Sequence, residues 1–455
     1  MPNAVLLAED RQTLASRLAE ARAKTDEIFS ILKPEALYER PIPERHRLVF
    51  YLGHVEAFDW NLIVRQTFGI DSFHSTFDKL FAFGIDPIGG GLPNEPASDW
   101  PDADAVRSYN ARVRGLVDDC VQGARAPRQG SDLETIFNMA IEHRLMHAET
   151  LAYLIHQLRY ESKIQPSNEP GARPAGRPGR AAGAAGGPAG MAGSPKAVGI
   201  PAGIATLGRG RQERVFGWDN EFERMSVHVP EFLIEAHKVS NGRFLEFVRD
   251  GGYEDRRHWS DASWEWRRRE DIRHPSFWHE RDGEWSYRGM FALIPLPMDA
   301  PVYVSHAEAS AFARWEGRSL PTEPQFHRAA YGAPDGSERE YPWGDDAPMK
   351  SRGNFDLRLW DPTPVGAYPR GDSAFGVSEL VGNGWEWTST VFGPFPGFRP
   401  HPLYEGYSAN FFDGAHFVQK GGSPRTAACM LRRSFRNWFQ PHYSYVYAGF
   451  RLVGP

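Results

Sequence analysis

The chain is divided by the stretch GARPAGRPGRAAGAAGGPAG, residues 171–190, which contains only glycine, alanine, arginine and proline. This composition offers almost no side chain to bury, so burial cannot offset the entropy lost on ordering it. We therefore interpret residues 164–203 as a linker between two domains, residues 1–163 and 204–455. A length of 455 residues agrees with two domains, because a single hydrophobic core rarely grows so large.

Four long segments before the linker carry apolar residues at the 3.6-residue period of an amphipathic helix. They are residues 8–32, 44–67, 103–124 and 131–161. Ser131 followed by Glu134 predicts a capping box at the start of the fourth segment. Four helices with turn-rich connections are typical of a bundle, so we predict a four-helix bundle for the first domain.

The sequence after the linker has short apolar runs among Gly, Pro, Asn and Asp, and it holds most of the 14 Trp residues. Only brief helices are expected there, for example at residues 305–316. A domain so rich in loops needs dense aromatic packing, which the Trp, Phe and Tyr content can supply. The whole chain is thus predicted to be an α+β protein with a bundle followed by a loop-rich domain.

Composition excludes several classes of partner. The chain is 41% hydrophobic and 24% charged, and its net charge of -6 comes without a polybasic run, so neither nucleic acid nor an anionic membrane is expected. The first residues lack the features of a signal peptide, and no stretch is long enough to span a bilayer. Cys120 and Cys429 lie far apart and form neither a disulfide framework nor a zinc motif. We expect a cytoplasmic protein that acts on small molecules.

The fourth helical segment contains EHRLMHAE, residues 142–149, in which two histidines lie four residues apart. On a helix, His143 and His147 share one face, so their rings can converge on one metal ion. His54, from the second segment, is expected to complete the site. Imidazole suits iron, zinc, copper and nickel, so the spacing leaves the metal open. A chance surface pair is the alternative, and Glu149 is expected to support the site or contact the bundle rather than bind the metal.

Six motifs follow in the second domain, and their order is more specific than any one of them. They are FGWDNE (216–221), PVYVS (301–305), LPTE (320–323), GNGWEWT (382–388), RSFRNW (433–438) and GFR (449–451). Together with the three histidines they resemble the ergothioneine-type sulfoxide synthases over nearly all of the chain outside the linker. The resemblance implies a DinB-like bundle joined to a domain of the formylglycine-generating-enzyme type, with a C-type-lectin-like fold. We expect Trp385, Trp387 and Arg451 to hold loops together rather than do chemistry.

The resemblance also implies a non-heme iron oxidoreductase that uses dioxygen. In this family, Fe(II) on the three histidines supports the joining of a chalcogen donor to the imidazole C2 of hercynine, the trimethylated betaine of histidine. A tyrosine of the second domain supplies a proton or a hydrogen atom, which a phenol can give. The matching stretch is PLYEGYS, residues 402–408, in which Tyr404 is the first candidate and Tyr407 the second. The alternative is that both rings only pack the loop.

Substrate contacts follow from the same resemblance. Asn437 corresponds to the family's Asn that binds the betaine carboxylate, and an amide NH2 is a suitable donor. Trp438 can contact the quaternary ammonium through cation–π attraction. The active site is therefore expected between the two domains, with iron ligands from the bundle and most substrate contacts from the loop-rich domain.

The chain departs from relatives that use γ-glutamylcysteine. Phe439 and Tyr443 stand where those relatives have Asp and Arg, residues 89–92 contain no counterpart of a bundle-side Arg, and Met146 replaces a common Gln. Bidentate Arg contacts to carboxylates are not replaced by Phe or Tyr. The departures favour a less charged donor, a selenosugar as in the selenoneine synthases, bound near Phe439, Tyr443 and Met146. A sulfoxide synthase that uses cysteine or γ-glutamylcysteine is the alternative.

Two other classes of protein share parts of this pattern. Copper-dependent formylglycine generation needs a pair of cysteines, and Cys429 is the only cysteine after the linker, which excludes it. A non-catalytic binding module with a vestigial or structural zinc site is the other possibility. Iron with hercynine-dependent oxygen consumption would distinguish the enzyme from such a module.

Overall fold

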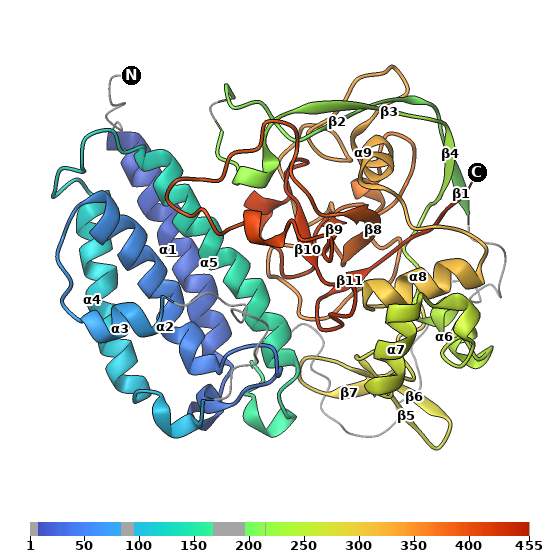
Figure 1. Cartoon of the computed structure of the whole chain (residues 1–455), viewed down its shortest axis with the longest axis horizontal. Helices are drawn as coiled ribbons and strands as arrows, with labels where there is room; N and C mark the ends of the chain where they lie inside the picture. Colours follow the sequence, from blue (N-terminus) through green and yellow to red (C-terminus); the bar gives the residue numbers. More distant parts are fainter. Residues whose placement is uncertain (1–7, 83–94, 167–195, 214, 455) are drawn as a thin grey trace.

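The computed structural model describes residues 8–82, 95–166, 196–213 and 215–454, and it contains two domains side by side (Figure 1). Residues 89–92, which contain no counterpart of the relatives' bundle-side Arg, and residues 167–195 of the predicted linker lie outside this description. None of the helices among the described residues is long and apolar enough to cross a membrane.

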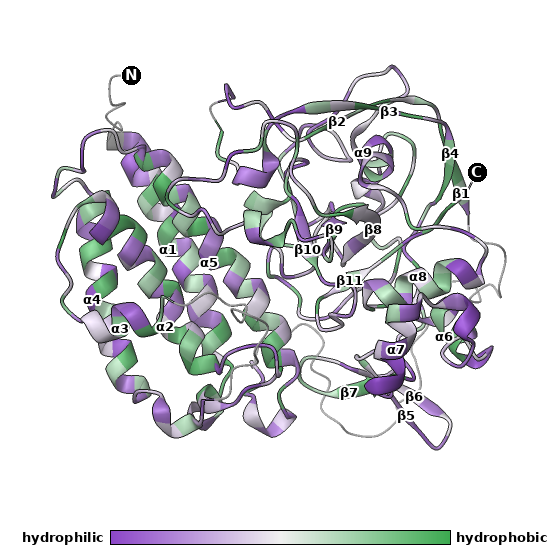
Figure 2. Ribbon diagram, in the orientation of Figure 1, coloured by the Kyte–Doolittle hydropathy of each residue, from purple (hydrophilic) through white to green (hydrophobic). Residues whose placement is uncertain are grey.

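The first domain is the predicted four-helix bundle. Its helices are α1 (Ala8–Ser30), α2 (Leu48–Asp59), the short α3 (Ser75–Leu80), α4 (Ala103–Val121) and α5 (Leu133–His156). A π-helical segment, Trp60–Thr67, continues α2 to the predicted end. The helix α1 packs on α5, and α2 packs on α4. Figure 2 shows many apolar residues along α2 and α5, the two helices that carry the histidines.

The predicted cap of α5 is wrong by one residue. Asp132, not Ser131, is the N-cap, and its carboxylate accepts a hydrogen bond from the backbone N–H of Thr135 at 3.2 Å. Both residue types cap helices well, but a carboxylate also interacts favourably with the positive end of the helix dipole. Glu134 lies in the first turn and does not take part in a capping box with Ser131.

The second domain is mixed and irregular, as predicted. Its helices are α6 (Asn241–Arg249), α7 (Asp261–Arg269), α8 (His306–Trp315) and α9 (Glu323–Tyr331). Its strands are β1 (Ala197–Ile200), β2 (Gly203–Leu207), β3 (Met225–Val229), β4 (Phe232–Glu235), β5 (Trp278–Arg281), β6 (Glu284–Arg288), β7 (Leu293–Pro295), β8 (Trp385–Val391), β9 (Phe417–Lys420), β10 (Asn437–Phe439), β11 (Ala448–Gly449) and β12 (Val453–Gly454).

The sheet in the order β10-β9-β8-β11 lies nearest the bundle (Figure 1). The strand β9 is antiparallel to β8 and β10, whereas β11 runs parallel to β8. The other sheets are β1-β4-β12, β2-β3 and β5-β6-β7. Short strands are expected where turns recur so often, and the loops between them carry most of the remaining chain.

The predicted linker extends too far toward the second domain. Residues 197–200 form β1, which pairs antiparallel with β4. Ile200 is buried, and the ladder to β4 satisfies the backbone of this small-residue strand. Pairing with a distant strand is a tertiary contact, which composition alone does not reveal.

Aromatic and charged side chains stabilise the loops. The Trp387 indole N–H donates to the Val304 carbonyl at 2.9 Å. Arg451 is fully buried and forms two hydrogen bonds with the Glu386 carboxylate, at 2.7 and 2.8 Å. Lys238 pairs with the same carboxylate. These contacts agree with the structural roles expected for Trp387 and Arg451.

The helix α5 forms much of the boundary between the domains. Glu142 near its middle contacts Arg432, Glu149 contacts Trp385, and the His156 ring is hydrogen-bonded to the Tyr447 hydroxyl at 3.0 Å. Three residues of one helix, spaced seven positions or about two turns apart, are thus anchored to the second domain. The histidine pair lies between the first two anchors.

Candidate metal centre

Three imidazoles converge inside the bundle at the domain boundary. His54 comes from α2, and His143 and His147 come from α5. The His147 Nε2 lies 3.2 Å from the His54 Nε2 and 3.2 Å from the His143 Nε2. All three side chains are buried, and their ligand atoms lie within 4.8 Å of one another. The structure therefore places the three histidine rings that the sequence predicted as metal ligands next to one another.

The orientation of His54 is fixed by its other nitrogen. The His54 Nδ1 lies 2.7 Å from the Phe81 carbonyl, which can only accept, so Nδ1 carries the proton and Nε2 presents its lone pair to the cluster. Gly53 makes this contact possible, because a Cβ at this position would lie 2.5 Å from the Phe81 ring. A hydrogen bond from the second nitrogen is the usual way in which proteins orient a metal-binding histidine.

Burial keeps the three imidazoles neutral. It lowers the pKa of His54 to about 4, and it lowers the pKa values of His143 and His147 well below the ordinary value. Neighbouring histidines and the charge of Arg144 lower the last two pKa values further. Neutral imidazole is the form that binds metal, so the cluster requires no proton loss near neutral pH.

A buried charge network holds α5 against α2. Arg144 is fully buried and donates to the Glu56 carboxylate at 2.8 and 2.9 Å and to the Asp59 carboxylate at 2.6 Å. It follows His143 in α5, while the two acids follow His54 in α2. The network therefore fixes the register between the two helices that carry the histidines.

The donor set suits a first-row transition metal, ferrous iron included. His54, His143 and His147 would hold such an ion with three neutral nitrogen ligands from two helices. With each Nδ1 protonated, the three Nε2 lone pairs face one another at short range, and a cation between them would relieve their repulsion. The Nδ1 atoms of His143 and His147 are buried, and within the described residues they have no hydrogen-bond partner.

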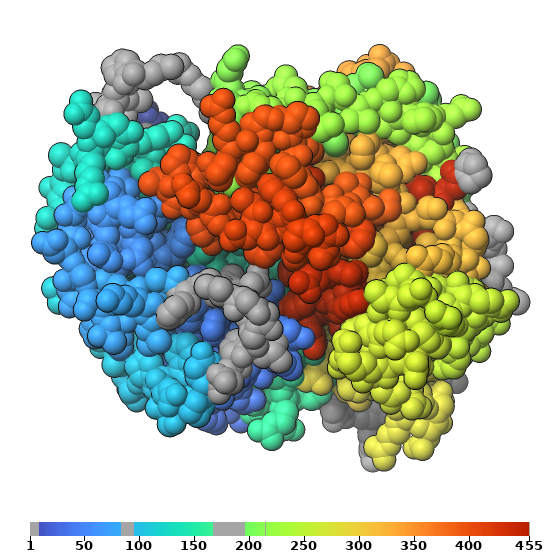
Figure 3. All heavy atoms as spheres, viewed as in Figure 1, coloured from blue at the N-terminus to red at the C-terminus, as the bar shows by residue number. Residues whose placement is uncertain are grey.

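The tyrosine-bearing loop of the second domain lies over this cluster. The Tyr404 ring is 6.2 Å from the His143 ring and 5.3 Å from Phe58, which stacks on His143 at 3.5 Å. Tyr407 is buried, and its hydroxyl donates to the Met146 sulfur at 3.3 Å. Figure 3 shows residues around 400, in orange-red, extending across the boundary between the domains. Both candidate tyrosines thus lie beside the cluster, Tyr404 nearer to a histidine ring and Tyr407 next to Met146.

Tyr407 is held by a tryptophan from the FGWDNE motif. The Trp218 ring stacks on Tyr407 at 4.0 Å, and its indole N–H donates to the Glu142 carboxylate at 2.9 Å. Burial raises the pKa of Tyr407 well above its ordinary value, and nearby carboxylates add to this rise. The phenol of Tyr407 therefore stays protonated.

Four of the five predicted substrate contacts lie on β10 and in the residues after it, whereas Met146 lies on α5. The Asn437 side-chain amide donates to the side-chain Oε1 of Gln419 at 2.9 Å, which orients its amide group. Trp438 lies against Phe392 at 4.3 Å and against Tyr407 at 5.4 Å. Asn437 and Trp438 are both only partly buried, so ligands can reach them.

Phe439 and Tyr443 form a stacked pair 5.1 Å apart with nearly parallel rings. The Arg45 guanidinium donates to the Tyr443 hydroxyl at 2.9 Å. Arg45 is buried, and its charge contributes to the lowered pKa of His147, after burial and His54. Sequence reasoning missed Arg45, which precedes α2. The basic run Arg45-His46-Arg47 ahead of an apolar helix was the available signal.

Two acids on α5 also have roles that the sequence did not specify. Glu142 contacts Trp218 and Arg432, and Glu149 accepts hydrogen bonds from Trp385, at 2.7 Å, and from Thr426, at 2.8 Å. The prediction that Glu149 supports the site without binding the metal agrees with this position. The two acids bracket the histidine pair and connect it to the second domain.

Two protein-family models match the chain. The model of the DinB superfamily matches residues 17–151, and the model of a sulfatase-modifying factor enzyme 1-like domain matches residues 187–454. The second match alone covers more than half of the chain. Together the two models account for the helical first domain and the irregular second domain.

Named relatives span both domains. The chain is 39% identical over 350 residues to a hercynine oxygenase of Mycobacterium tuberculosis, covering 76% of this chain and 77% of that protein. It is 33% identical over 463 residues to a hercynine oxygenase of Mycolicibacterium smegmatis, covering 97% and 99%. It is 27% identical to ergothioneine biosynthesis protein 1 of Neurospora crassa, covering 93% of this chain and 55% of that protein.

Proposed function

The chain belongs to the family of the hercynine oxygenases, and on this premise we propose that it joins a chalcogen donor to the imidazole C2 of hercynine. The reaction uses dioxygen and ferrous iron, which His54, His143 and His147 hold. The convergence of their three Nε2 atoms is the observation that carries the proposal. We further propose that the protein is cytoplasmic.

Bound iron supplies the activation of dioxygen and of the chalcogen donor. The chain's own residues orient the substrates and handle protons. Tyr404 is the proposed proton or hydrogen-atom donor, because its ring lies near the His143 ring and is only partly buried. Tyr407 is the second candidate, but its hydroxyl is engaged with Met146. Its proposed role is to position the neighbouring Tyr404 ring, which lies 5.7 Å away.

Hercynine is proposed to bind along β10. The Asn437 amide, oriented by Gln419, donates a second N–H to the betaine carboxylate. Trp438 offers a partly exposed aromatic face to the trimethylammonium group, an attraction worth roughly 0.5 to 2 kcal/mol. The two contacts bind the two charged groups of the betaine, one each, and thereby direct its imidazole toward the histidine cluster.

A selenosugar is the proposed donor. The stacked rings of Phe439 and Tyr443 offer an aromatic face and a hydroxyl group, which suit a sugar ring better than a carboxylate. Met146 also contributes an uncharged side chain beside His147. The product of this reaction class is the selenoxide precursor of selenoneine.

Arg45 favours a second candidate, a sulfoxide synthase that uses cysteine or γ-glutamylcysteine. A buried guanidinium that contacts Tyr443 and influences His147 is a suitable partner for a thiol donor's carboxylate. The two candidates share hercynine, iron and dioxygen and differ in the charge of the donor.

The test is product analysis with purified protein, Fe(II), hercynine and either a selenosugar or a thiol donor. Oxygen uptake that depends on hercynine, together with a product whose mass contains both substrates, is expected with the selenosugar. Tightly bound zinc without turnover on any donor would contradict the enzyme proposal and favour a binding module.

The Arg45→Met variant separates the two donors, and Arg65→Met, a change at an exposed residue, is its matched control. Loss of a carboxylate contact raises KM for a thiol donor by roughly ten-fold or more. For a selenosugar the KM should stay near the wild-type value. A raised KM for cysteine, combined with wild-type turnover of cysteine at saturation, would assign the thiol as the natural donor.

A further inference from the structure

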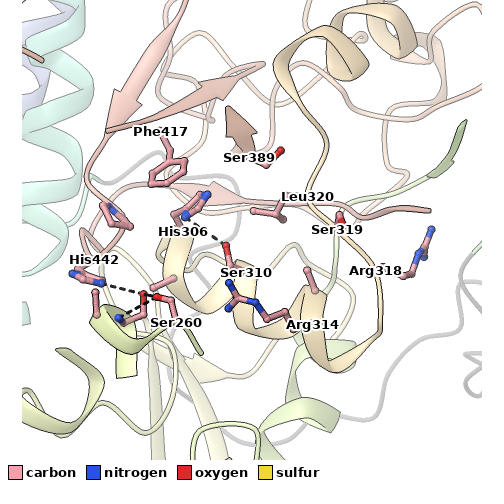
Figure 4. A pocket seen from close by; sticks show the side chains of 15 residues that line it. Ser260, His306, Ser310, Arg314, Arg318, Ser319, Leu320, Ser389, Phe417 and His442 are labelled. Atoms are coloured by element: carbon pink, nitrogen blue, oxygen red, sulfur yellow. Dashed lines mark hydrogen bonds between the residues drawn. The ribbon is translucent and has the colours of Figure 1, made fainter. Parts of the chain in front are cut away.

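A cavity of about 430 Å3 lies in the second domain between α7, α8 and the end of β10 (Figure 4). Its lining contains none of the three clustered histidines. The volume falls within the range of small-molecule sites, roughly 300 to 1,000 Å3. Neither the metal centre nor the proposed reaction uses this cavity.

The lining has one sign of charge. It contains two arginines, two histidines and five serines, and no aspartate or glutamate occurs among the described residues that line it. Arg318, at one end, pairs with the buried carboxylate of Glu235. Arg314 donates one of the five N–H groups of its guanidinium to the His258 carbonyl, at 2.8 Å.

The two histidines have defined hydrogen-bond geometry. The His306 Nε2 lies 3.2 Å from the Thr388 carbonyl, so this nitrogen carries the proton and Nδ1 faces the Ser310 hydroxyl. The His442 Nε2 lies 3.3 Å from the Ser263 hydroxyl. The pKa of His306 is lowered to about 3, mainly by burial, with smaller contributions from Arg314 and His442.

Apolar surface completes the cavity. The Phe417 ring stacks on His306 at 3.7 Å, and Leu320 and Pro441 also line the space. Hydroxyl donors, a guanidinium and an imidazole thus surround a pocket that has one aromatic wall. Such a lining suits anions, since a carboxylate or phosphate can accept from Arg314, His442 and the serine hydroxyls without facing an acid among the described lining residues.

We propose that this cavity is a second ligand site, which binds a small organic oxyanion through Arg314, His442 and the serine hydroxyls. The anionic group is a carboxylate or a phosphate, and the carbon body of the ligand packs on Phe417. The site is separate from the three-histidine cluster but shares a chain segment with it, because His442 immediately precedes Tyr443.

Trp266 provides a spectroscopic reporter. Its ring stacks on the His442 imidazole at 4.7 Å with an angle of 7° between the planes. An anion that binds His442 changes the field at this indole and therefore its fluorescence. The Trp266→Phe variant should lose this signal while it keeps the heat of binding measured by calorimetry.

The test uses the full-length protein with inorganic phosphate in one arm and succinate in the other, at constant ionic strength set with chloride. Saturable binding of at least one anion is expected. Arg314→Gln and His442→Gln should each weaken it by roughly ten-fold. Arg281→Gln, at an exposed arginine outside the cavity, is the control and should bind like the wild type.

The two arms identify the anionic group, since the preferred anion binds more tightly and shows the larger loss in both variants. Arg314 is exposed, so its change removes no core packing, whereas His442→Gln also removes the ring that stacks on Trp266. Far-UV circular dichroism checks that both variants are folded. Absence of saturable binding of both anions at millimolar concentration, or equal affinity in Arg314→Gln and wild type, overturns the proposal.

Discussion

Replacement of Arg432 by Met should destabilise the contact between the domains more than any surface change. Arg432 is only 7% exposed and lies between two buried carboxylates, Glu142 of α5 and Glu221 of the second domain. Its N–H groups make four hydrogen bonds to these two acids and one to the Cys429 carbonyl. The Met side chain fills much of the volume but donates nothing.

The expected loss of stability depends on the hydrogen bonds that Glu142 and Glu221 keep when Arg432 is replaced. Removing one partner of a buried ion pair costs about 3 to 5 kcal/mol, because the other charge stays buried and uncompensated. Here two acids lose the same partner, but Trp218 still donates to both and Ser434 still donates to Glu221. Protonation of one acid also relieves part of the repulsion. We therefore expect a loss of about 4 kcal/mol in the free energy of unfolding at neutral pH.

The loss should depend on pH. Burial raises the pKa of Glu142 even while Arg432 opposes the rise. Without Arg432 the folded variant holds a proton that the unfolded chain releases above the ordinary glutamate pKa, so the variant's stability falls as pH increases through and above that value. The difference in the free energy of unfolding between the variant and the wild type should therefore be smaller at pH 5 than at pH 7.

Denaturant unfolding followed by tryptophan fluorescence and circular dichroism measures both effects. Arg268→Met is the matched control, since Arg268 and Glu265 form an exposed pair that contributes less than about 1 kcal/mol. A loss below about 1 kcal/mol in Arg432→Met, or no dependence on pH, would refute the view that this buried pair binds the domains together.

Three further outcomes are expected. His147→Ala should abolish iron binding, measured by metal analysis, because two ligands cannot hold the ion in place. The control His228→Ala, at an exposed position, should bind iron normally. Full iron content in His147→Ala would contradict the assigned site. Tyr404→Phe should keep iron but lower product formation about a hundred-fold, and an unchanged yield would remove Tyr404 from the reaction. Burial and the charge of Arg288 lower the pKa of Lys163 from 10.5 to about 7 in the folded protein. Between pH 7 and pH 10.5 the unfolded chain therefore binds more protons than the folded protein does. Wild-type stability should therefore rise from pH 7 to pH 10 by on the order of 3 kcal/mol, a rise that Lys163→Met should lack and that pH-dependent unfolding measures.

The bundle and its three histidines could be predicted because their signals are local. Helical periodicity and the four-residue spacing of His143 and His147 depend on one helix at a time, and a matching helical His54 needed only the bundle topology. The cap of α5 was missed by one residue because Ser131 and Asp132 are both good N-caps.

The remaining features depend on contacts between distant parts of the chain. Arg45 approaches Tyr443 across almost 400 positions of sequence, and Glu142 meets Arg432 across 290. Strand β1 is only four residues long, and it pairs with β4, more than thirty positions further along the chain. No periodicity encodes such pairings, so only three-dimensional structure reveals them.

The acids on either side of the histidine pair set the order in which the two domains are synthesised and dock. Glu142 and Glu149 leave the ribosome long before residues 385–432 are made, at a translation rate that implies a delay on the order of tens of seconds. During this interval both carboxylates remain hydrated and ionised on an open helix face. Docking of the completed C-terminal half is what removes their water, so closure over the imidazoles is a late event of maturation.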